Sequence, residues 1–379
     1  MRSAISAAPS SAPSGARAAR IALYCPSLPP SQGGVADHTA LLARALAGRG
    51  ADVAVLGRTG EALGGIETVL GVTPLGEHGL AATAAGTGAG FVLVQYVPFL
   101  YARFGLAPWL VVALRALRGA GVRIGLFVHE PYVPFTRPSW WVTGWPMRWQ
   151  LRALVRSSDV VCASVPAFLA SARRSARADA RLLLLPVGST IPVVAGSRTA
   201  ARAALGLGPS EIAIGVFSPG ASGLSRDWVA RAALALGGRQ VRWVFFGRNA
   251  EAPPAGFPAR APSQCLGWIA PEQASAIFGA LDVAAQPFAD GLTLRRTSAM
   301  AALAHGVPLV SARGPLFDPA LDGAAVCAPT ADEFVASLAH LVETPALREA
   351  QGLRGRAFYT ARGSSEVAAD LLLAALEAA

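Results

Sequence analysis

The stretch RIALYCPSLPPSQGGVADHTALLARALAGRGADVAVL, residues 20–56, decides the fold class of this chain. A short apolar run, Arg20–Tyr24, opens the stretch and a second run, Asp52–Leu56, closes it. Between them the apolar residues of segment 35–49 recur with the helical period, and Gly50 stands where a helix C-cap is expected. A strand, a helix and a second strand in this order predict a parallel βαβ unit.

The same alternation of strands and helices continues along the rest of the chain. Further runs of strand length are Phe91–Gln95, Arg123–His129, Asp159–Ala163 and Arg181–Leu185. After the irregular segment Pro192–Arg198 the pattern restarts with Glu211–Phe217, Arg242–Phe246, Asp282–Ala285 and Val307–Val310. We therefore expect an α/β protein with two Rossmann-like, doubly wound domains, residues 20–192 and 193–363, and a cleft between them.

Composition excludes several classes of protein. Hydrophobic residues make up 53% of the 379, which excludes a disordered chain, and two domains suit this length. The four cysteines lie far apart without a CxxC pair, which excludes a zinc site by spacing and indicates a reducing, cytoplasmic compartment. The formal charge of +10 comes from arginine alone, because the chain has no lysine. This charge indicates either an arginine-favouring codon bias or an anionic partner.

The beginning of the chain and its apolar segments bear on targeting. Residues 1–19 are rich in Ser, Ala and Pro and lack the apolar core of a signal peptide, so we expect a disordered tail. No stretch reaches the roughly 18 uninterrupted apolar residues of a membrane-spanning helix. We expect a cytoplasmic protein that is able to lie peripherally at the inner face of a membrane.

The loop after the first strand contains adjacent glycines, Gly33 and Gly34, directly before the first helix. Adjacent glycines let a backbone approach a phosphate or sugar closely, and the helix start offers free N–H groups. The spacing matches neither GxGxxG nor GxxxxGK[ST]. The alternative is an ordinary flexible turn.

His129 and Glu130 stand at the predicted carboxyl end of a strand, in the segment VHEPYVP. A neutral imidazole there can donate to a substrate hydroxyl, and the carboxylate can orient it or take a hydroxyl proton. The alternative is a pair of solvated residues at the rim of the cleft.

The segment FADGLTLRRTSAMAALAHGVPLV, residues 288–310, predicts a second binding loop followed by a helix. We expect Asp290 and Gly291 after the strand, Thr293 as a helix cap, and Arg295 and Arg296 in the first helical turn. Cations are unfavourable at a helix N-terminus, so the two arginines indicate an anionic ligand there. Solvent-facing arginines are the alternative.

Two further loops carry glycine beside arginine. Gly220 and Gly223 precede Arg226, which we expect at the start of a helix, and Gly247 precedes Arg248 after a strand. Both loops are candidate phosphate clamps, the second a weaker one.

Four segments, taken in their order, resemble the GT-B glycosyltransferases of the family-4-like group. They are GGVADHTALLARALAGRGADV from residue 33, VHEPYVP from 128, PVGSTIP from 186 and LDVAAQPFADGLTLRRTSAMAALAHGVPLV from 281. The resemblance implies two Rossmann-like domains, with the nucleotide-sugar in the second and the acceptor in the first. It also implies catalysis without a metal or another cofactor, and a final helix, matched by Ser364–Ala378, that crosses back to the first domain.

The resemblance assigns roles to individual residues. It implies that Gly33 and Gly34 approach the donor diphosphate, that His129 contacts the transferred sugar, and that Arg226 belongs to the diphosphate clamp. The clamp lysine of the family is missing, so Arg295 or Arg296 would substitute for it. The family's paired glutamates are missing too: Ala301 stands where the second belongs, and Asp290 could replace the first. We expect Asp290, Gly291 and Thr293 on the donor side, and His38, Tyr96 and Tyr132 on the acceptor side.

The resemblance favours a retaining transfer of a sugar from a UDP- or GDP-sugar to a sugar or lipid-linked acceptor, as in polysaccharide biosynthesis. The alternatives are a nucleotide-sugar epimerase on the same fold and a non-catalytic relative that binds nucleotide-sugars. Nucleic-acid binding is not expected, because the arginines are dispersed without a known motif.

Aromatic residues lie beside arginines in RPSWWVTGWPMRWQLR, residues 137–152. The four tryptophans of this segment could lie at a lipid headgroup level, with Arg137, Arg148 and Arg152 on anionic lipid. The alternative is that the tryptophans pack around an ordinary corner between a loop and a helix.

Overall fold

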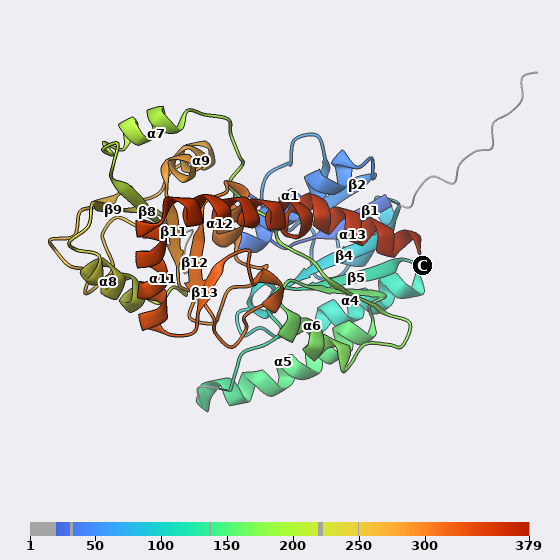
Figure 1. Cartoon of the computed structure of the whole chain (residues 1–379). Helices are drawn as coiled ribbons and strands as arrows, with labels where there is room; N and C mark the ends of the chain where they lie inside the picture. The colour runs from blue at the N-terminus through green and yellow to red at the C-terminus, as the bar shows by residue number, and fades with distance from the viewer. Residues whose placement is uncertain (1–19, 31–32, 136–137, 219–222, 249, 379) are drawn as a thin grey trace, which may run out of the picture.

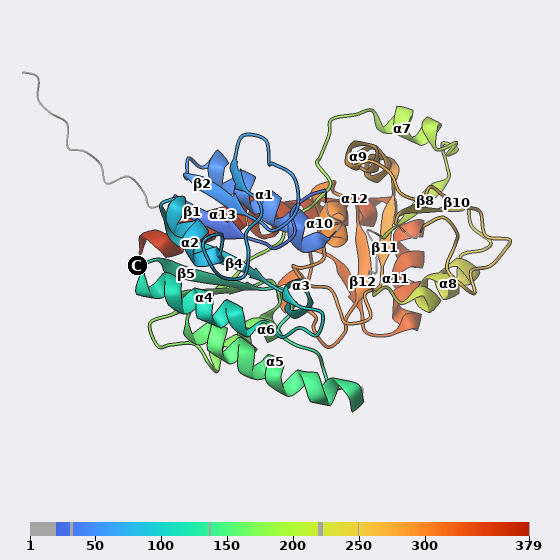
Figure 2. The same ribbon diagram turned by 180° about the vertical axis from the view of Figure 1, so that it is seen from behind.

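The computed structural model describes residues 20–30, 33–135, 138–218, 223–248 and 250–378, arranged as two α/β domains side by side (Figures 1 and 2). Each domain is built on one parallel sheet, so the predicted fold class is confirmed. The expected tail, residues 1–19, lies outside the described residues, as does Arg137.

The N-terminal domain has a seven-stranded sheet in the order β3-β2-β1-β4-β5-β6-β7. Its strands are β1 (Arg20–Tyr24), β2 (Val53–Leu56), β3 (Glu67–Val69), β4 (Ala89–Tyr96), β5 (Arg123–Val128), β6 (Val160–Ala163) and β7 (Arg181–Leu184). The central strands are apolar on both faces because helices cover both sides of the sheet. Of the two short edge strands of this domain, β7 was predicted from the sequence and β3 was not.

The helices of this domain form two layers around the sheet. They are α1 (Gly34–Gly48), α2 (Leu80–Gly86), α3 (Pro98–Tyr101), α4 (Pro108–Gly119), α5 (Pro138–Arg156) and α6 (Pro166–Arg173). Leucines of α4 and α5 pack on one face of the sheet and leucines of α1 pack on the other. Gly50 follows the last turn of α1 at φ +80°, so the predicted C-cap is confirmed.

The C-terminal domain has a six-stranded sheet in the order β10-β9-β8-β11-β12-β13. Its strands are β8 (Ile212–Ser218), β9 (Val241–Gly247), β10 (Ser263–Cys265), β11 (Val283–Gln286), β12 (Leu309–Ala312) and β13 (Val326–Ala328). Its helices are α7 (Arg198–Ala204), α8 (Arg226–Ala235), α9 (Pro271–Ala280), α10 (Thr297–Ala304), α11 (Ala331–Glu343) and α12 (Pro345–Phe358).

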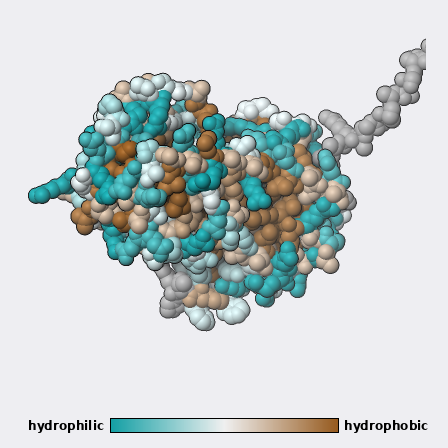
Figure 3. Space-filling view, viewed as in Figure 1, coloured by the Kyte–Doolittle hydropathy of each residue, from teal (hydrophilic) through white to brown (hydrophobic). Residues whose placement is uncertain are grey.

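The chain crosses between the domains twice. It passes from β7 into the C-terminal domain, and it returns through a π-helical turn, Tyr359–Gly363, into the last helix α13 (Ser365–Glu377). Ala368, Ala369 and Leu372 of α13 are buried in the same core cluster as α1. Figure 3 shows hydrophobic side chains along α13 where it lies on the N-terminal domain. Helix α13 therefore packs on the N-terminal domain.

One predicted helix start is wrong. The sequence placed Arg295 and Arg296 in a first helical turn capped by Thr293, but α10 begins at Thr297 with Arg296 as its N-cap residue. The Thr293 side chain is buried instead of capping the helix. Residues 287–296 form an irregular loop because Leu292 and Leu294 are buried in the domain core, which holds the loop against the sheet edge.

In the part of the chain that the structure describes, no helix combines the length and the apolar character that crossing a bilayer requires.

Candidate functional site

The carboxyl ends of the strands of both sheets face the boundary between the two domains. His129 follows β5 in the N-terminal domain, and the loop 287–296 follows β11 in the C-terminal domain. The backbone N–H of Val187 donates to the carbonyl oxygen of Leu294 at 3.3 Å, which holds that loop against the crossing segment. Ligands of doubly wound sheets bind at such strand ends.

Asp290 joins the two arginines of the loop. Its two carboxylate oxygens accept hydrogen bonds from the guanidinium groups of Arg295 and Arg296, one oxygen each. A guanidinium nitrogen of Arg295 also lies 3.9 Å from the carboxylate of Glu130, across the domain boundary. Asp290, Arg295 and Arg296, which we expected together at the cleft, do contact one another. The two arginines are, however, already bonded to carboxylates of this chain. Their charge is available to a ligand only in exchange with Asp290.

Arg296 is a perturbed titratable side chain of this cluster, because it is largely buried next to a second arginine. Burial and the neighbouring Arg295 lower the pKa of Arg296, while its contact with Asp290 opposes that shift. The guanidinium group of Arg296 also lies 4.5 Å from the centre of the Phe288 ring. An arginine held in this way is costly to desolvate, so an additional anion near it would be stabilising.

His129 lies on a second cluster, beneath the arginines. Its Nε2 donates to the side-chain oxygen of Gln95 at 2.7 Å, which leaves Nδ1 as an acceptor. The His129 ring stacks on Phe127 and meets the ring of His38 edge-on at 5.0 Å between centroids. His38 Nδ1 lies 3.3 Å from the carbonyl oxygen of Val187, so α1 is tied to the crossing segment at this point.

Both histidines are neutral at pH 7. Burial lowers the pKa of His38 to about 4. Burial, together with His38 and Arg295 nearby, lowers the pKa of His129 well below its usual value. The side-chain nitrogens Gln95 Nε2 and His38 Nε2 are buried without a hydrogen-bond partner among the described residues. A neutral imidazole beside uncommitted polar groups is suited to binding hydroxyl groups rather than to carrying positive charge.

A pocket of about 370 Å³ lies between the domains on the other side of α1. Asp37, Leu41 and Arg44 of α1 line one wall, and Arg248 and Trp268 belong to the opposite wall. Trp268 is 64% exposed. Burial raises the pKa of Asp37, and Arg248 opposes this shift across the domain boundary. The pocket therefore offers a flat aromatic face beside arginine side chains.

The start of α1 lies between the pocket and the histidine cluster. Gly33 is the N-cap residue and Gly34 begins the helix, and both are exposed. A Cβ atom added at either glycine would have open space around it. Packing within the chain does not require these glycines, whereas a close approach of a ligand would.

Gly291 differs from these glycines. It has φ +99°, and a Cβ atom there would lie 2.8 Å from the backbone nitrogens of Gly314 and Phe317. Contact with the neighbouring loop therefore explains this glycine without a ligand. Thr293 is fully buried, and its hydroxyl has no hydrogen-bond partner among the described residues.

Of three other predicted site residues, Tyr96 and Tyr132 lie away from the clusters, whereas Arg226 follows a segment that is bonded to the loop 287–296. Tyr96 is fully buried, its hydroxyl accepts from Gln150, and burial raises its pKa to about 12. Tyr132 bonds Ser171 at 3.0 Å and faces a groove outside the cleft. Arg226 begins α8, as predicted, and the segment before it is bonded to the loop 287–296: the backbone N–H of Ser225 donates to the carbonyl oxygen of Pro287 at 2.8 Å, and that of Ala289 donates to the carbonyl oxygen of Gly223 at 2.9 Å. None of the three contacts His129 or Arg295 through an interaction of the described residues.

Sequence reasoning missed Gln95 and Trp268. Gln95 was taken as part of an apolar strand, although a glutamine at a strand's carboxyl end is a polar signal of the kind used for His129. Trp268 follows β10, a strand of three residues that the sequence did not indicate.

Comparison with known proteins supports the fold. No family model matches the chain, and no curated protein is similar to it in sequence. HepE from Anabaena, solved in complex with UDP, aligns at a TM-score of 0.66 with 16% identity over 95% of this chain and 100% of HepE. WaaG, a glycosyltransferase involved in lipopolysaccharide biosynthesis, aligns at 0.64 with 14% identity over 93% and 99%.

A putative UDP-N-acetylglucosamine 2-epimerase from Listeria monocytogenes aligns with a TM-score of 0.57 and 11% identity, over 95% of this chain and 96% of the epimerase. The chain has the GT-B fold of these solved proteins. At these identities the likeness establishes the fold alone.

Proposed function

We propose that the protein is a glycosyltransferase that uses a nucleotide-diphosphate sugar. The observation that carries the proposal is the pocket that both domains line, at the strand ends, next to the start of α1. A nucleotide needs an aromatic or apolar face for its base and cations or N–H groups for its phosphates. Trp268 supplies the first, Arg44 and Arg248 line the same pocket as cations, and the N–H groups at the start of α1 would complete the second. The UDP bound to HepE supports the same class of ligand.

The sugar would lie on the other side of the α1 start, between His129 and the loop 287–296. His129 Nδ1 can accept a hydrogen bond from a sugar hydroxyl because Nε2 is committed to Gln95. Asp290 can bind sugar hydroxyls once a diphosphate takes over part of its contact with Arg295 and Arg296. This exchange replaces the paired glutamates that the chain lacks.

We propose a retaining reaction. The acceptor oxygen forms a bond to the anomeric carbon on the same face from which the diphosphate departs, while the bond from that carbon to the diphosphate breaks and its electron pair leaves with the diphosphate. The acceptor proton passes to a phosphate oxygen or to Glu130, whose carboxylate is more than half exposed at the cleft. The guanidinium groups, rather than a metal ion, would stabilise the charge that develops on the leaving group.

The acceptor would approach from the N-terminal domain. We propose a hydroxyl-bearing sugar acceptor, free or lipid-linked, of the kind used in polysaccharide biosynthesis. A nucleotide-sugar epimerase is the second candidate, because the aligned Listeria protein carries that description. Incubation with each UDP- or GDP-sugar without an acceptor separates the two, because only an epimerase releases a new sugar nucleotide or a new free sugar.

The binding pocket is tested by replacing its aromatic wall. Trp268→Ala should weaken binding of the preferred nucleoside diphosphate at least about fivefold in calorimetry, because base–aromatic stacking contributes about 1–3 kcal/mol. Trp149→Ala is the matched control, since Trp149 is equally exposed on α5, away from the pocket, and it should leave the affinity unchanged. The proposal fails if UDP, GDP and ADP all fail to bind at millimolar concentration, or if Trp268→Ala binds as the wild type does.

A further inference from the structure

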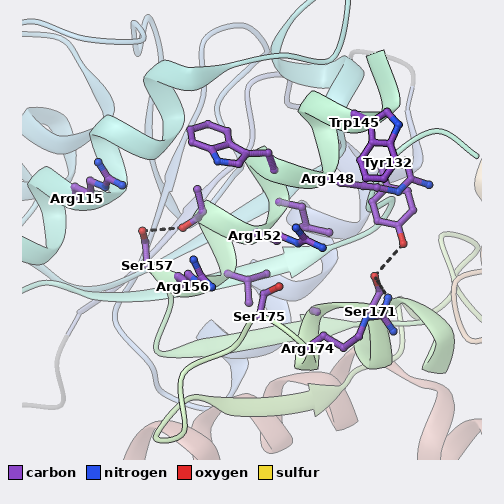
Figure 4. Close-up of a pocket in the computed structure, with 15 residues that line it drawn as sticks. Arg115, Tyr132, Trp145, Arg148, Arg152, Arg156, Ser157, Ser171, Arg174 and Ser175 are labelled. Carbon is purple, nitrogen blue, oxygen red and sulfur yellow. Dashed lines mark hydrogen bonds between the residues drawn. The ribbon is translucent and has the colours of Figure 1, made fainter. Parts of the chain in front are cut away.

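A second hollow lies on the N-terminal domain, outside the cleft. It is a groove of about 940 Å³ between α4, α5 and α6, shown in Figure 4. Five arginines line it: Arg115, Arg148, Arg152, Arg156 and Arg174. Neither aspartate nor glutamate is among its lining residues. We call it the arginine groove.

The five arginines of the arginine groove form no ion pair with any described residue. This contrasts with their neighbours: Arg118, one turn after Arg115, and Arg177, just after α6, both lie 3.1 Å from the carboxylate of Asp159. The sequence explains the difference, because residues 78–158 contain eight arginines and a single acidic residue, Glu130. Glu130 faces Arg295 in the cleft. The arginine groove is therefore a concentrated positive surface without internal compensation.

Helix α5 supplies most of this surface. Trp145, Trp149, Arg152 and Arg156 follow one another at spacings of three or four residues, and Arg148 lies three residues after Trp145, so they share one helical face. Figures 1 and 2 both show α5 along the outer edge of the N-terminal domain, with its first turns extending beyond the neighbouring helices.

One arginine of the groove, Arg148, is held in place by its neighbours. The guanidinium group of Arg148 stacks between the rings of Tyr132 and Phe135, at 3.9 and 3.8 Å from their centres. It also donates to the carbonyl oxygens of Val133 and Gly144. Arg152 and Arg156, by contrast, are exposed toward the hollow.

Large apolar side chains border the arginine groove and are also uncovered. Trp141, Trp145 and Trp149 are each more than half exposed, and Val142 is 78% exposed. Trp141 and Trp145 pack against Phe135, so these rings form one aromatic group at the end of the helix. Exposed aromatic and aliphatic residues next to unpaired arginines are the composition that helices at a membrane interface show.

We propose that the arginine groove and the exposed face of α5 bind the surface of a membrane that contains anionic phospholipid. The arginines bind lipid phosphates, and the three tryptophans with Val142 enter the headgroup region. Charge complementarity favours an anionic surface. The exposed aliphatic and aromatic side chains favour lipid over a soluble polyanion, because a soluble polyanion would leave Val142 exposed to water. The inference does not depend on the nucleotide-sugar chemistry proposed above.

The arginine groove lies close to the cleft between the domains. Helix α6 separates it from the cleft: Ser171 and Arg174 face the groove, whereas Phe168 lies under Arg295 of the cleft at 5.6 Å. A membrane bound at the groove would therefore lie one helix away from the cluster of Arg295 and Asp290. A lipid-linked molecule could reach the cleft from there.

The experiment is flotation of the full chain with lipid vesicles. Vesicles of phosphatidylcholine with about one-third phosphatidylglycerol should carry the protein upward at about 0.1 M salt, and pure phosphatidylcholine vesicles should carry much less. Arg152→Ala with Arg156→Ala should lower the partition coefficient about twenty-fivefold, since each basic residue contributes roughly fivefold. Trp145→Ala with Trp149→Ala should also lower it.

Two control variants keep the result interpretable. Arg231→Ala with Arg260→Ala removes the same charge from exposed sites on the C-terminal domain and should leave vesicle binding within a factor of about two, as surface charges distant from the contact contribute little. Trp268→Ala should leave vesicle binding unchanged.

Three outcomes would overturn the proposal. The first is no flotation of the wild type with anionic vesicles. The second is equal flotation with neutral vesicles. The third is binding of a single-stranded oligonucleotide or of inorganic pyrophosphate that the groove variants abolish while vesicle binding stays the same. The first two outcomes would exclude an anionic membrane as the ligand of the arginine groove. The third would show that the groove binds a soluble anion instead.

Discussion

Asp290 bonds two arginines at once, and this makes it the residue that best tests the proposed diphosphate clamp. Without its carboxylate, Arg295 and Arg296 repel each other in a partly buried place. A diphosphate that binds there would then relieve more repulsion than it does in the wild type.

Asp290→Asn should therefore lower the melting temperature of the unliganded protein, by the equivalent of about 1–3 kcal/mol. It should also gain a larger thermal shift with the preferred nucleoside diphosphate than the wild type gains. Asp322→Asn is the control, because it breaks an exposed pair with Arg313 and should change little. If the thermal shift of Asp290→Asn with every diphosphate is no larger than that of the wild type, the arginines serve structure alone.

Two glycines near the cleft should respond differently to the same substitution. Gly291→Ala places a Cβ atom 2.8 Å from two backbone nitrogens at φ +99°, and we expect it to destabilise the protein by at least about 2 kcal/mol. Gly33 is extended, with φ 179°, and has open space around it, so Gly33→Ala should stay within about 0.5 kcal/mol of the wild type. Urea unfolding measures both.

Gly33→Ala should nevertheless weaken nucleotide binding, since the added methyl group protrudes where a phosphate would approach the start of α1. A Gly33→Ala protein with full nucleotide affinity would show that the diphosphate lies elsewhere.

At the scale of elements, α13 contributes buried side chains to the core of the N-terminal domain. It belongs to the C-terminal end of the chain yet covers α1, and Arg49 of α1 pairs with Asp370 of α13. Arg123 at the start of β5 also donates to the carbonyl oxygen of Leu376 at 3.0 Å.

Leu372→Ala should destabilise the protein by about 2–5 kcal/mol, because Leu372 is fully buried between α13 and the sheet. The adjacent Leu371 is 43% exposed, and Leu371→Ala should cost little. The urea midpoint of each variant measures the difference. Equal midpoints would mean that α13 does not hold the N-terminal domain together.

The elements also show what sequence could predict. The unit β1–α1–β2 was predicted because its apolar residues have clear periods. The strands β3 and β10 have three residues each, too few for a period. Helix α5 has Pro146 inside it and tryptophans on its exposed side, so its pattern did not indicate a helix of 19 residues.

The site divides in the same way. His129, Asp290 and Arg295 could be predicted because polar residues at strand ends point to the cleft in this class of fold. That Asp290 already bonds both arginines could not be predicted, because it depends on the path of an irregular loop. The burial of Tyr96 and Thr293 likewise depends on which way each side chain points.

At the scale of the whole molecule, the two crossings place both ends of the described chain on one domain. Strand β1 begins at Arg20 and α13 ends at Glu377, and both lie in the N-terminal domain. The C-terminal domain is thus an insertion between β7 and α13. Both crossings border the cleft, the first at Val187 and the second at Ser365. The two crossings lie against each other, because a Cβ atom placed on Gly188 would lie only 3.0 Å from the backbone nitrogen of Ser365.

This topology has a mechanical consequence. A force applied between residues 20 and 378 loads the seven-stranded sheet and the seam between α1 and α13, while the C-terminal domain hangs outside the line of tension. The seam must peel open before any pull reaches the inserted domain. The resistance of the molecule to stretching is therefore a property of one domain, and a ligand held only by the other would leave the first rupture force unchanged.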